Sequence, residues 1–345
     1  MKVAQLQTFD VPEKAVFCTD VPDPPAPGPN QITADIEAFP LNPADLHQCE
    51  GTYAVRPDLP ALIGAEAVGR VREVGANVTT LAAGDRIIFR NRENWVQRKT
   101  VDVSDTIRLP DAFQVHKGQA NMDQVDIGRD LILQAAMLKV NPATALMMLR
   151  DYVQPEPGDY VIHNAANSAV GVHIVKMAER NGWRTLNVVR SDAAEKAVRA
   201  AGGDIVLRDT DELPDAVAEA ADGRPVRLGI DSVGGESSRR LASSLSENAT
   251  LVTFGRISGQ PMQLDSRNLI FRGLTVRGFW LSGGLANRSA CEIEALYREL
   301  AEDIAAGRLH TAIEATYPIS EIKQALAHAR RSNRSGKIVV VPQGG

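Results

Sequence analysis

The segment His163–Gly171, with the sequence HNAANSAVG, has the residue types and the position of a phosphate-binding turn. It follows a predicted strand and opens a predicted helix, as that turn does in dinucleotide-binding units. Ala166 and Ser168 occupy the positions of the first two glycines of the G-x-G-x-x-G pattern, and Gly171 keeps the third. Small side chains still let the backbone approach a pyrophosphate, and the helix start offers free N–H groups. The segment therefore predicts a dinucleotide site, with a tight strand–helix turn that binds no ligand as the alternative.

A basic residue ends the next predicted strand. Sites for NAD usually carry an acidic residue about 20 residues after the glycines, where it holds the ribose hydroxyls. Arg190 occupies that place here, directly after Asn187-Val188-Val189. A guanidinium pairs with a 2′-phosphate, whereas a carboxylate repels it. The sequence therefore predicts NADPH as the cofactor. A solvated surface arginine is the alternative, because Asp192 lies close to Arg190 in the chain.

The elements that would position these residues fall into two patterns. Residues 1–140 contain short predicted strands separated by Gly- and Pro-rich turns, which is typical of a β barrel or sandwich. Residues 141–286 alternate strands with helices, which predicts a doubly wound parallel sheet of the Rossmann type. The tail, 287–345, ends in a predicted strand and is expected to rejoin the first part. The polar segment Phe113–Asp130 is predicted to be a loop or an insertion. The predicted strands are Gln31–Phe39, Ala67–Val74, Arg86–Phe89, Tyr160–His163, Thr185–Val189, Ile205–Leu207, Arg227–Asp231, Thr250–Phe254, Thr275–Phe279 and Lys337–Val341, and the predicted helices are Ala169–Asn181, Ala193–Ala201 and Cys291–Ala306.

Length, charge and cysteine content limit the classes of protein that fit. At 345 residues the chain is long enough for two domains. Its net charge of −5 gives no reason to expect nucleic acid or an anionic membrane as a partner. Three scattered cysteines make neither a disulfide framework nor a metal motif. No targeting segment or membrane span is evident, so a cytoplasmic location is expected.

Two further segments resemble signatures of the medium-chain dehydrogenase/reductase superfamily. Gly64–Gly69 is similar to its G-H-E-x-x-G signature, and Gly84–Arg86 to its G-D-R-V signature. This resemblance implies that the β-rich domain has the GroES-like fold. The zinc enzymes of the superfamily need Cys and His ligands, but Asn42 and Ala65 stand at two of those positions. We therefore expect no zinc, and reduction then needs a hydroxyl donor or a conjugated acceptor.

Within the superfamily, the chain resembles the mitochondrial 2-enoyl thioester reductase family. The similar segments run in the family's order over nearly the whole chain. They are NPAD at 42–45, GTY at 51–53, VNPATA at 140–145, NAANSAVG at 164–171, NVVR at 187–190, TFG at 253–255 and RGFWLS at 277–282.

The resemblance implies an activity and a set of site residues. The activity is NADPH-dependent reduction of the C2=C3 bond of trans-2-enoyl thioesters. Tyr53 would be the acid that completes the reduction, and Trp280 would border the acyl channel. A homodimer that pairs strand Thr275–Phe279 with its copy is also expected. The residues expected to line the NADPH site are Asn141, Asn167, Ser168, Ala169, Val170, Arg190, Phe254, Gly255, Arg256, Ile257, Phe279, Trp280, Leu281 and Lys337.

Several alternatives stay open at this point. The chain would also fit a zinc-free reductase of quinones, haloacrylates or other activated alkenes, or a non-catalytic NADPH-binding protein. Tyr53 would otherwise be a packed or surface tyrosine. The basic run Arg330–Arg334 would suit a CoA phosphate or an acyl carrier protein, and a solvated helix end is its alternative. The sequence does not distinguish CoA from carrier protein, nor does it give the acyl length.

Overall fold

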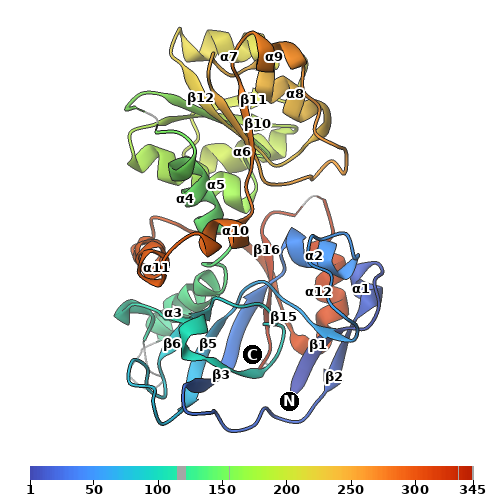
Figure 1. Cartoon of the computed structure of the whole chain (residues 1–345), viewed down its shortest axis with the longest axis vertical. Helices are drawn as coiled ribbons and strands as arrows, with labels where there is room; N and C mark the ends of the chain where they lie inside the picture. The colour runs from blue at the N-terminus through green and yellow to red at the C-terminus, as the bar shows by residue number, and fades with distance from the viewer. Residues whose placement is uncertain (115–121, 155, 333, 344–345) are drawn as a thin grey trace. The chain divides into compact units, whose positions relative to one another are not determined.

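The chain divides into two compact units, which are described one at a time. In the computed structural model, the first unit comprises Met1–Val140 and Cys291–Gly345, and the second comprises Asn141–Ala290 (Figure 1). The structure describes residues 1–114, 122–154, 156–332 and 334–343.

The first unit is built around one long strand, β3 (Gln31–Pro40). It pairs antiparallel with β5 (Val68–Val74) and β7 (Arg98–Asp102), and with β16 (Lys337–Val341) from the end of the chain. The sheet runs β15-β16-β3-β5-β6-β8, with β7 also on β3, and a second sheet runs β2-β1-β4. The other strands of this unit are β1 (Lys2–Leu6), β2 (Val16–Asp20), β4 (Ala61–Leu62), β6 (Arg86–Phe89), β8 (Thr106–Arg108) and β15 (Ile313–Pro318).

The apolar core of this unit joins parts of the chain that are far apart in sequence. Ile32 and Ile36 of β3, which point to one face because side chains alternate along a strand, are fully buried in the same cluster as Ile338 of β16. Leu326 of α12 is buried there too, so the tail completes the core. The helices of this unit are α1 (Pro12–Ala15), α2 (Pro43–Cys49), α3 (Met122–Ala136), α11 (Ala290–Ala305, which starts at the boundary) and α12 (Ile322–Ala329).

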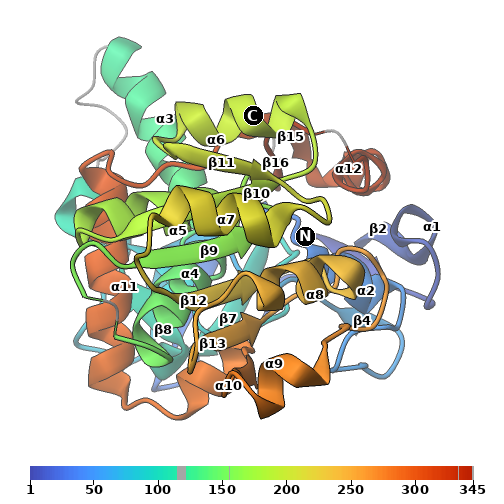
Figure 2. The same cartoon turned by 90° about the horizontal axis from the view of Figure 1, so that it is seen from above.

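The second unit is a parallel sheet with helices between successive strands, which confirms the predicted α/β class. The strand order is β11-β10-β9-β12-β13-β14, and Figure 2 shows β11, β10, β9, β12 and β13 side by side in that order. All of these pairs are parallel. The order reverses at β9, the switch point at which such sheets bind their ligands. The strands are β9 (Tyr160–Asn164), β10 (Arg184–Val189), β11 (Ile205–Arg208), β12 (Val226–Asp231), β13 (Thr250–Thr253) and β14 (Thr275–Gly278). The helices are α4 (Asn141–Asp151), α5 (Ala169–Arg180), α6 (Asp192–Ala200), α7 (Leu213–Ala221), α8 (Gly235–Ser243), α9 (Ser266–Ile270) and α10 (Leu281–Ala286).

One predicted segment is wrong in part: a helix replaces the expected loop over residues 122–130. The polar run Phe113–Asp130 was expected to be a loop or an insertion, but α3 begins at Met122 and continues to Ala136. Leu133 and Ala135, in the second half of this helix, are buried. Residues 122–130 therefore form the first part of a helix. Residues 115–121 lie outside the described residues.

Among the described residues, no single helix is long and apolar enough to cross a bilayer. The successive helical segments Gly128–Ala136 and Asn141–Asp151 would satisfy the criterion of length and composition only as a bent pair.

The buried histidine of β9 makes the second unit sensitive to acid. His163 is 1% exposed, and its Nε2 lies 2.8 Å from Oδ1 of Asn187 on β10. Burial lowers the pKa of His163 to about 4, although the contact with Asn187 acts in the opposite direction. In the unfolded chain a histidine titrates near 6.5. The folded protein therefore binds fewer protons, and the stability that this provides above pH 6.5 is lost as the pH falls from 6.5 through 4.

We expect this histidine to account for about 3 kcal/mol of acid destabilisation in total, and for about 2 kcal/mol at pH 5. The free energy of unfolding of the wild type should fall between pH 7.5 and 5 by about 2 kcal/mol more than that of His163→Gln. The matched control is His310→Gln, since the His310 side chain is 56% exposed. An equal fall in wild type and His163→Gln would contradict the assignment.

Candidate functional site

The turn between β9 and α5 in the second unit is tight, and a serine cap and a glycine shape it. Ser168 is the N-cap of α5, and its Oγ accepts a hydrogen bond of 3.1 Å from the Gly171 N–H. A Cβ on Gly171 would lie 2.4 Å from the carbonyl oxygen of Ala166, so only glycine fits at this third motif position. Ala166 itself is fully buried, whereas Asn167 is exposed at the tip. The degenerate motif thus keeps the one glycine on which the close approach of strand and helix depends.

A buried amide behind this turn ties the ends of β9 and β12 to helix α8. Asn164, the last residue of β9, donates to Oδ1 of Asp231 at 2.7 Å and to Oγ of Ser237 at 3.0 Å. Its Oδ1 accepts from the Ser232 N–H at 2.8 Å. Asp231, the last residue of β12, also accepts from the N–H groups of the turn that follows it. The sequence did not single out these residues, although buried polar side chains at successive strand ends were the available signal.

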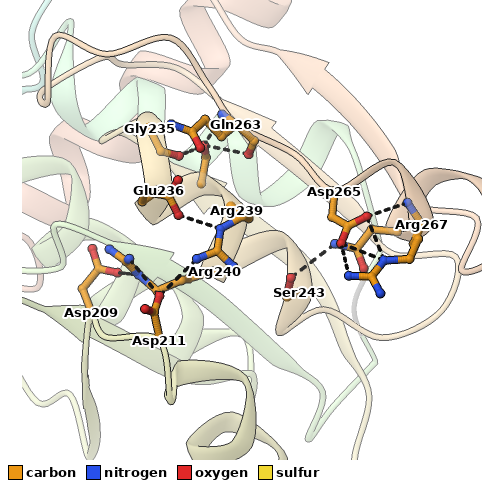
Figure 3. Close-up of polar contacts among 12 residues, drawn as sticks. Asp209, Asp211, Gly235, Glu236, Arg239, Arg240, Ser243, Gln263, Asp265 and Arg267 are labelled. Atoms are coloured by element: carbon orange, nitrogen blue, oxygen red, sulfur yellow. Dashed lines mark hydrogen bonds and ion pairs between the residues drawn. The ribbon is translucent and has the colours of Figure 1, made fainter.

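The same network continues onto α8, as Figure 3 shows for its arginines. Ser237 Oγ donates to Oδ2 of Asp209 at 2.6 Å, and Arg240 Nε donates to Oδ1 of Asp209 at 2.8 Å. Arg239 and Arg240 both contact Asp211, at 3.1 and 3.4 Å. The segments that follow β9, β11 and β12 are therefore fixed relative to one another. This fixed framework supports the residues that follow the carboxyl ends of the strands.

Arg190, which follows β10, is exposed and has a free guanidinium. It forms no ion pair or hydrogen bond with any other residue that the structure describes. Asp192, which argued against a phosphate-binding role, is paired with Arg208 instead. Glu195 also binds Arg208, at 2.8 Å. The carboxylates near Arg190 are thus occupied by another arginine, and Arg190 is available to an anion.

Other predicted cofactor residues of this unit follow the ends of β13 and β14. Phe254 donates its N–H to the Asp231 carbonyl at 3.0 Å, and Ile257 donates to the Ser232 carbonyl at 3.0 Å. Gly255 lies so close to Ser232 that a Cβ would come within 2.7 Å of its carbonyl oxygen. Arg256 is exposed. The segment therefore packs along the end of β12 by backbone contacts.

The segment after β14 contributes two aromatic side chains. Phe279 is buried and meets the Tyr152 ring edge-on at 6.4 Å. Trp280 is 48% exposed and is the N-cap of α10, whose first residue is Leu281. Asn141, the first residue of α4, is buried. In this unit the predicted residues of the strand ends thus gather at the carboxyl edge of the sheet.

The predicted acid, Tyr53, belongs to the first unit and lies in a loop directly after α2. The loop is held to the helix because the His47 carbonyl accepts from the N–H groups of Thr52, at 2.9 Å, and Tyr53, at 3.2 Å. Tyr53 is half-buried, and the Cζ atom of Arg92 lies 5.4 Å from the centroid of its ring. Sequence reasoning did not identify Arg92.

Lys337, predicted to line the cofactor site, is buried in a polar cluster of the first unit. Its Nζ donates to Oδ1 of Asn42 at 2.5 Å, and Asn42 Nδ2 donates to Oε1 of Glu66 at 2.8 Å. The other carboxylate oxygen of Glu66 accepts from the Val140 N–H at 2.8 Å. Burial raises the pKa of Glu66, and burial lowers the pKa of Lys337. The opposite charges of Glu66 and Lys337 partly offset these pKa shifts, so each charged group stabilises the other in the buried cluster.

A second buried lysine was missed by the sequence analysis. Lys139 donates from Nζ to the carbonyls of Ala65, at 2.7 Å, and Asn91, at 3.0 Å. Burial lowers its pKa, and the charge of Glu66 acts in the opposite direction. The lone lysine in the apolar run 135–140 was the signal for it.

The cluster occupies the positions at which zinc ligands were considered. Asn42 and Ala65 have no thiolate or imidazole, and two lysine ammonium groups bind beside them. Over the described part of the chain, no group of three or more His, Cys, Asp or Glu residues is arranged to hold a metal. Amide, ammonium and carbonyl groups are poor zinc ligands. The absence of zinc stays a prediction that rests on these residue types.

Comparisons with known proteins agree with the two-unit architecture. The alcohol dehydrogenase GroES-like domain model matches residues 28–105, and the zinc-binding dehydrogenase model matches 169–301. Among solved structures, the mitochondrial 2-enoyl thioester reductase heterodimer of Candida tropicalis is similar, with a TM-score of 0.83 at 24% identity over 99% of both chains. A mycobacterial quinone oxidoreductase is similar at a TM-score of 0.81 and 23% identity, covering 99% of this chain and all of the other.

Curated relatives are more informative about the family. The mitochondrial enoyl-[acyl-carrier-protein] reductase of Dictyostelium discoideum is 31% identical over 307 residues, which is 87% of this chain and 83% of the relative. The enzyme of the same name from Mus musculus is 34% identical over 309 residues, 88% of this chain and 79% of the relative.

These relatives contradict the expected cytoplasmic location, because both are named as mitochondrial enzymes. The expectation rested on scattered free cysteines and on the lack of a visible targeting segment. Free cysteines indicate a reducing environment and do not distinguish one reducing compartment from another.

Proposed function

Because the chain belongs to the enoyl thioester reductase family of the medium-chain dehydrogenases/reductases, we propose that it reduces the C2=C3 bond of trans-2-enoyl thioesters with NADPH. The observation that carries the proposal is the identity of 31% and more with enoyl reductases over most of the chain. Asn42 and Ala65 support it, since a site without a zinc-binding pair suits an acceptor that is already conjugated.

The fit to NADPH rests on residues of the second unit. The Ser168–Gly171 turn offers helix N–H groups to a pyrophosphate. Arg190 offers a guanidinium that is not engaged by a neighbouring carboxylate. When bound, NADPH supplies the hydride that adds to the β-carbon of the enoyl group.

Tyr53 supplies the proton in this proposal. Addition at the β-carbon pushes negative charge onto the α-carbon and the thioester oxygen, and this enolate must be stabilised and protonated. A phenol O–H can donate to it, and its half-buried ring lies in a loop that backbone hydrogen bonds hold to α2. Thr52 carries the other hydroxyl of this loop, and its Oγ1 lies 3.4 Å from Nδ1 of His47.

The thioester substrate carries its acyl group on CoA or on acyl carrier protein, and the basic run Arg330–Arg334 was considered as the surface that binds either one. Within the basic run, Arg330 is paired with Glu13 at 2.6 Å, and Arg334 donates to backbone carbonyls at 3.1 Å. Arg331 is exposed. Two of the three arginines therefore serve the local structure, which favours the solvated helix end over a docking surface.

A homodimer fits the exposed edge of the second unit. β14 is the last strand in the sheet order, so its outer side pairs with no further strand among the described residues. Ile270 and Phe271, shortly before it, are 68% and 76% exposed. Pairing of β14 with its copy across a two-fold axis would cover such an apolar surface.

A panel of acceptors tests the proposed function. Purified protein should oxidise NADPH with crotonyl-CoA and longer enoyl thioesters much faster than with quinones or aldehydes. Faster turnover with quinones would favour the activated-alkene or quinone alternative. No turnover with any acceptor, despite tight NADPH binding, would favour a binding protein.

Arg190→Ala should weaken NADPH binding about 10- to 100-fold, because a charge-assisted contact contributes about 1.5–3 kcal/mol. NADH affinity should change little, since NADH has no 2′-phosphate. Dissociation constants from fluorescence titration measure both. The matched control is Arg224→Ala. Arg224 is also exposed, but it lies just before β12, at the amino end of that strand. Equal losses for the two cofactors would show that Arg190 does not contact the 2′-phosphate.

Tyr53→Phe should lower turnover of crotonyl-CoA by about 100- to 10,000-fold, the usual contribution of a general acid. The variant keeps the ring and removes only the hydroxyl, so NADPH affinity and melting temperature should stay near the native values. Thr52→Val is the matched control for the neighbouring hydroxyl. If Tyr53→Phe turns over at nearly the native rate and Thr52→Val does not, Thr52 is the donor instead.

A further inference from the structure

Arg92 lies against the ring of the proposed acid. It belongs to the connection between β6 and β7, and its Cζ lies 5.4 Å from the centroid of the Tyr53 ring. A guanidinium within about 6 Å of a ring centroid is attracted to it. The Arg92 side chain is 28% exposed, so solvent screens this attraction only in part.

Two contacts of Arg92 lead to the helix that precedes the Tyr53 loop. Its Nη2 donates to Oε1 of Gln48 at 2.8 Å and lies 3.5 Å from Oδ1 of Asp45. Both partners are on α2. Arg92 therefore joins the helix to the aromatic ring of the loop that follows it.

Asp45 gives this arrangement a fixed anchor. Its side chain is fully buried, and its two oxygens accept from the Ala65 N–H, at 2.9 Å, and the Asn42 N–H, at 3.0 Å. Burial raises the pKa of Asp45, and the charge of Arg92 is the largest influence that lowers it. A carboxylate held by two backbone groups has little freedom to move, so it fixes the guanidinium as well.

Two lysines, the partly exposed Lys99 and the buried Lys139, fix the backbone around Arg92. Lys99 donates from Nζ to the Arg92 carbonyl at 2.9 Å and to the side-chain oxygens of Asn91 and Asn94 at 3.0 and 3.1 Å. Lys139 donates to the Asn91 carbonyl at 3.0 Å. The backbone on both sides of Arg92 is therefore tied to ammonium groups inside the unit.

One donor of Arg92 is not used. Its Nε is buried and has no hydrogen-bond partner among the described residues. A buried donor without an acceptor is costly. Folding stability alone is a poor explanation for the presence of Arg92. An arginine that served only to join the loop to α2 would stabilise the fold more if its Nε also had an acceptor.

We propose that Arg92 is a positioning residue for Tyr53, an inference that rests on the proposed role of Tyr53 as the acid. When the phenol donates, its O–H bond breaks and a C–H bond forms at the α-carbon from the enolate electron pair. The negative charge passes to the phenolate oxygen, which then takes a proton from water. Arg92 holds the ring in place and presents a positive charge to the group that becomes negative.

The test is a double-mutant cycle with crotonyl-CoA and NADPH. Arg92→Ala and Arg92→Gln should each lower kcat about tenfold, while the KM for NADPH stays within about twofold. Arg92→Lys, which keeps the charge, should recover part of the loss. In a Tyr53→Phe background, Arg92→Gln should change kcat less than about twofold, because the hydroxyl through which it acts is gone.

Arg90→Ala is the matched control, since Arg90 is in the same connection but donates to the Ser104 carbonyl. It should leave kcat unchanged. Melting temperatures show whether each variant is folded. If Arg92→Ala is not folded, Arg92→Gln is used in its place. An equal tenfold loss with and without the Tyr53 hydroxyl would overturn the inference and leave the proposed function intact. Native turnover of Tyr53→Phe would overturn the proposed role of Tyr53 and this inference with it, whereas failure to reduce crotonyl-CoA at all would overturn the proposed function.

Discussion

Charge buried inside the protein is the constraint on which the first unit depends. Asp45, Glu66, Lys139 and Lys337 are all nearly inaccessible, and an isolated buried charge would cost several kcal/mol. Each is paired or hydrogen-bonded: Glu66 through Asn42 and Val140, Lys139 through two carbonyls. Removing one member would leave the charge of its partner uncompensated. The loop that carries Tyr53 follows the helix that this cluster anchors.

The second unit meets a different constraint, which lies at the ends of its strands. Its parallel strands all end at one edge, where the backbone must turn sharply and still satisfy its N–H groups. Asn164 and Asp231 accept or donate across that edge, and Ser168 caps α5. A rigid edge of this kind lets a flexible ligand be held by a few exposed groups. Preorganisation, more than contact area, then determines affinity.

The sequence predicted most of the parallel sheet because its strands are apolar runs bounded by turn residues. β6 and β16 have the predicted limits, and the other predicted strands differ by a residue at an end. The strands β1, β2, β4, β7, β8 and β15 were not predicted, since each is either very short or mixes polar with apolar residues. The candidate site was predicted where a motif carries the residues. Arg92, Lys139 and Asn164 were missed because their roles come from contacts between distant segments, which no local pattern encodes.

The ion pair of Arg208 with Asp192 and Glu195 has a consequence for how cofactor preference can change. Two residues beyond Arg190 the chain already carries a carboxylate of the type that holds ribose hydroxyls in sites for NAD. That carboxylate is occupied only because Arg208, on the neighbouring strand, neutralises it. Loss of Arg208 would release it without any new acidic residue. A descendant of this chain thus needs only two substitutions, at positions 190 and 208, to exchange a surface that attracts a phosphate for one that repels it.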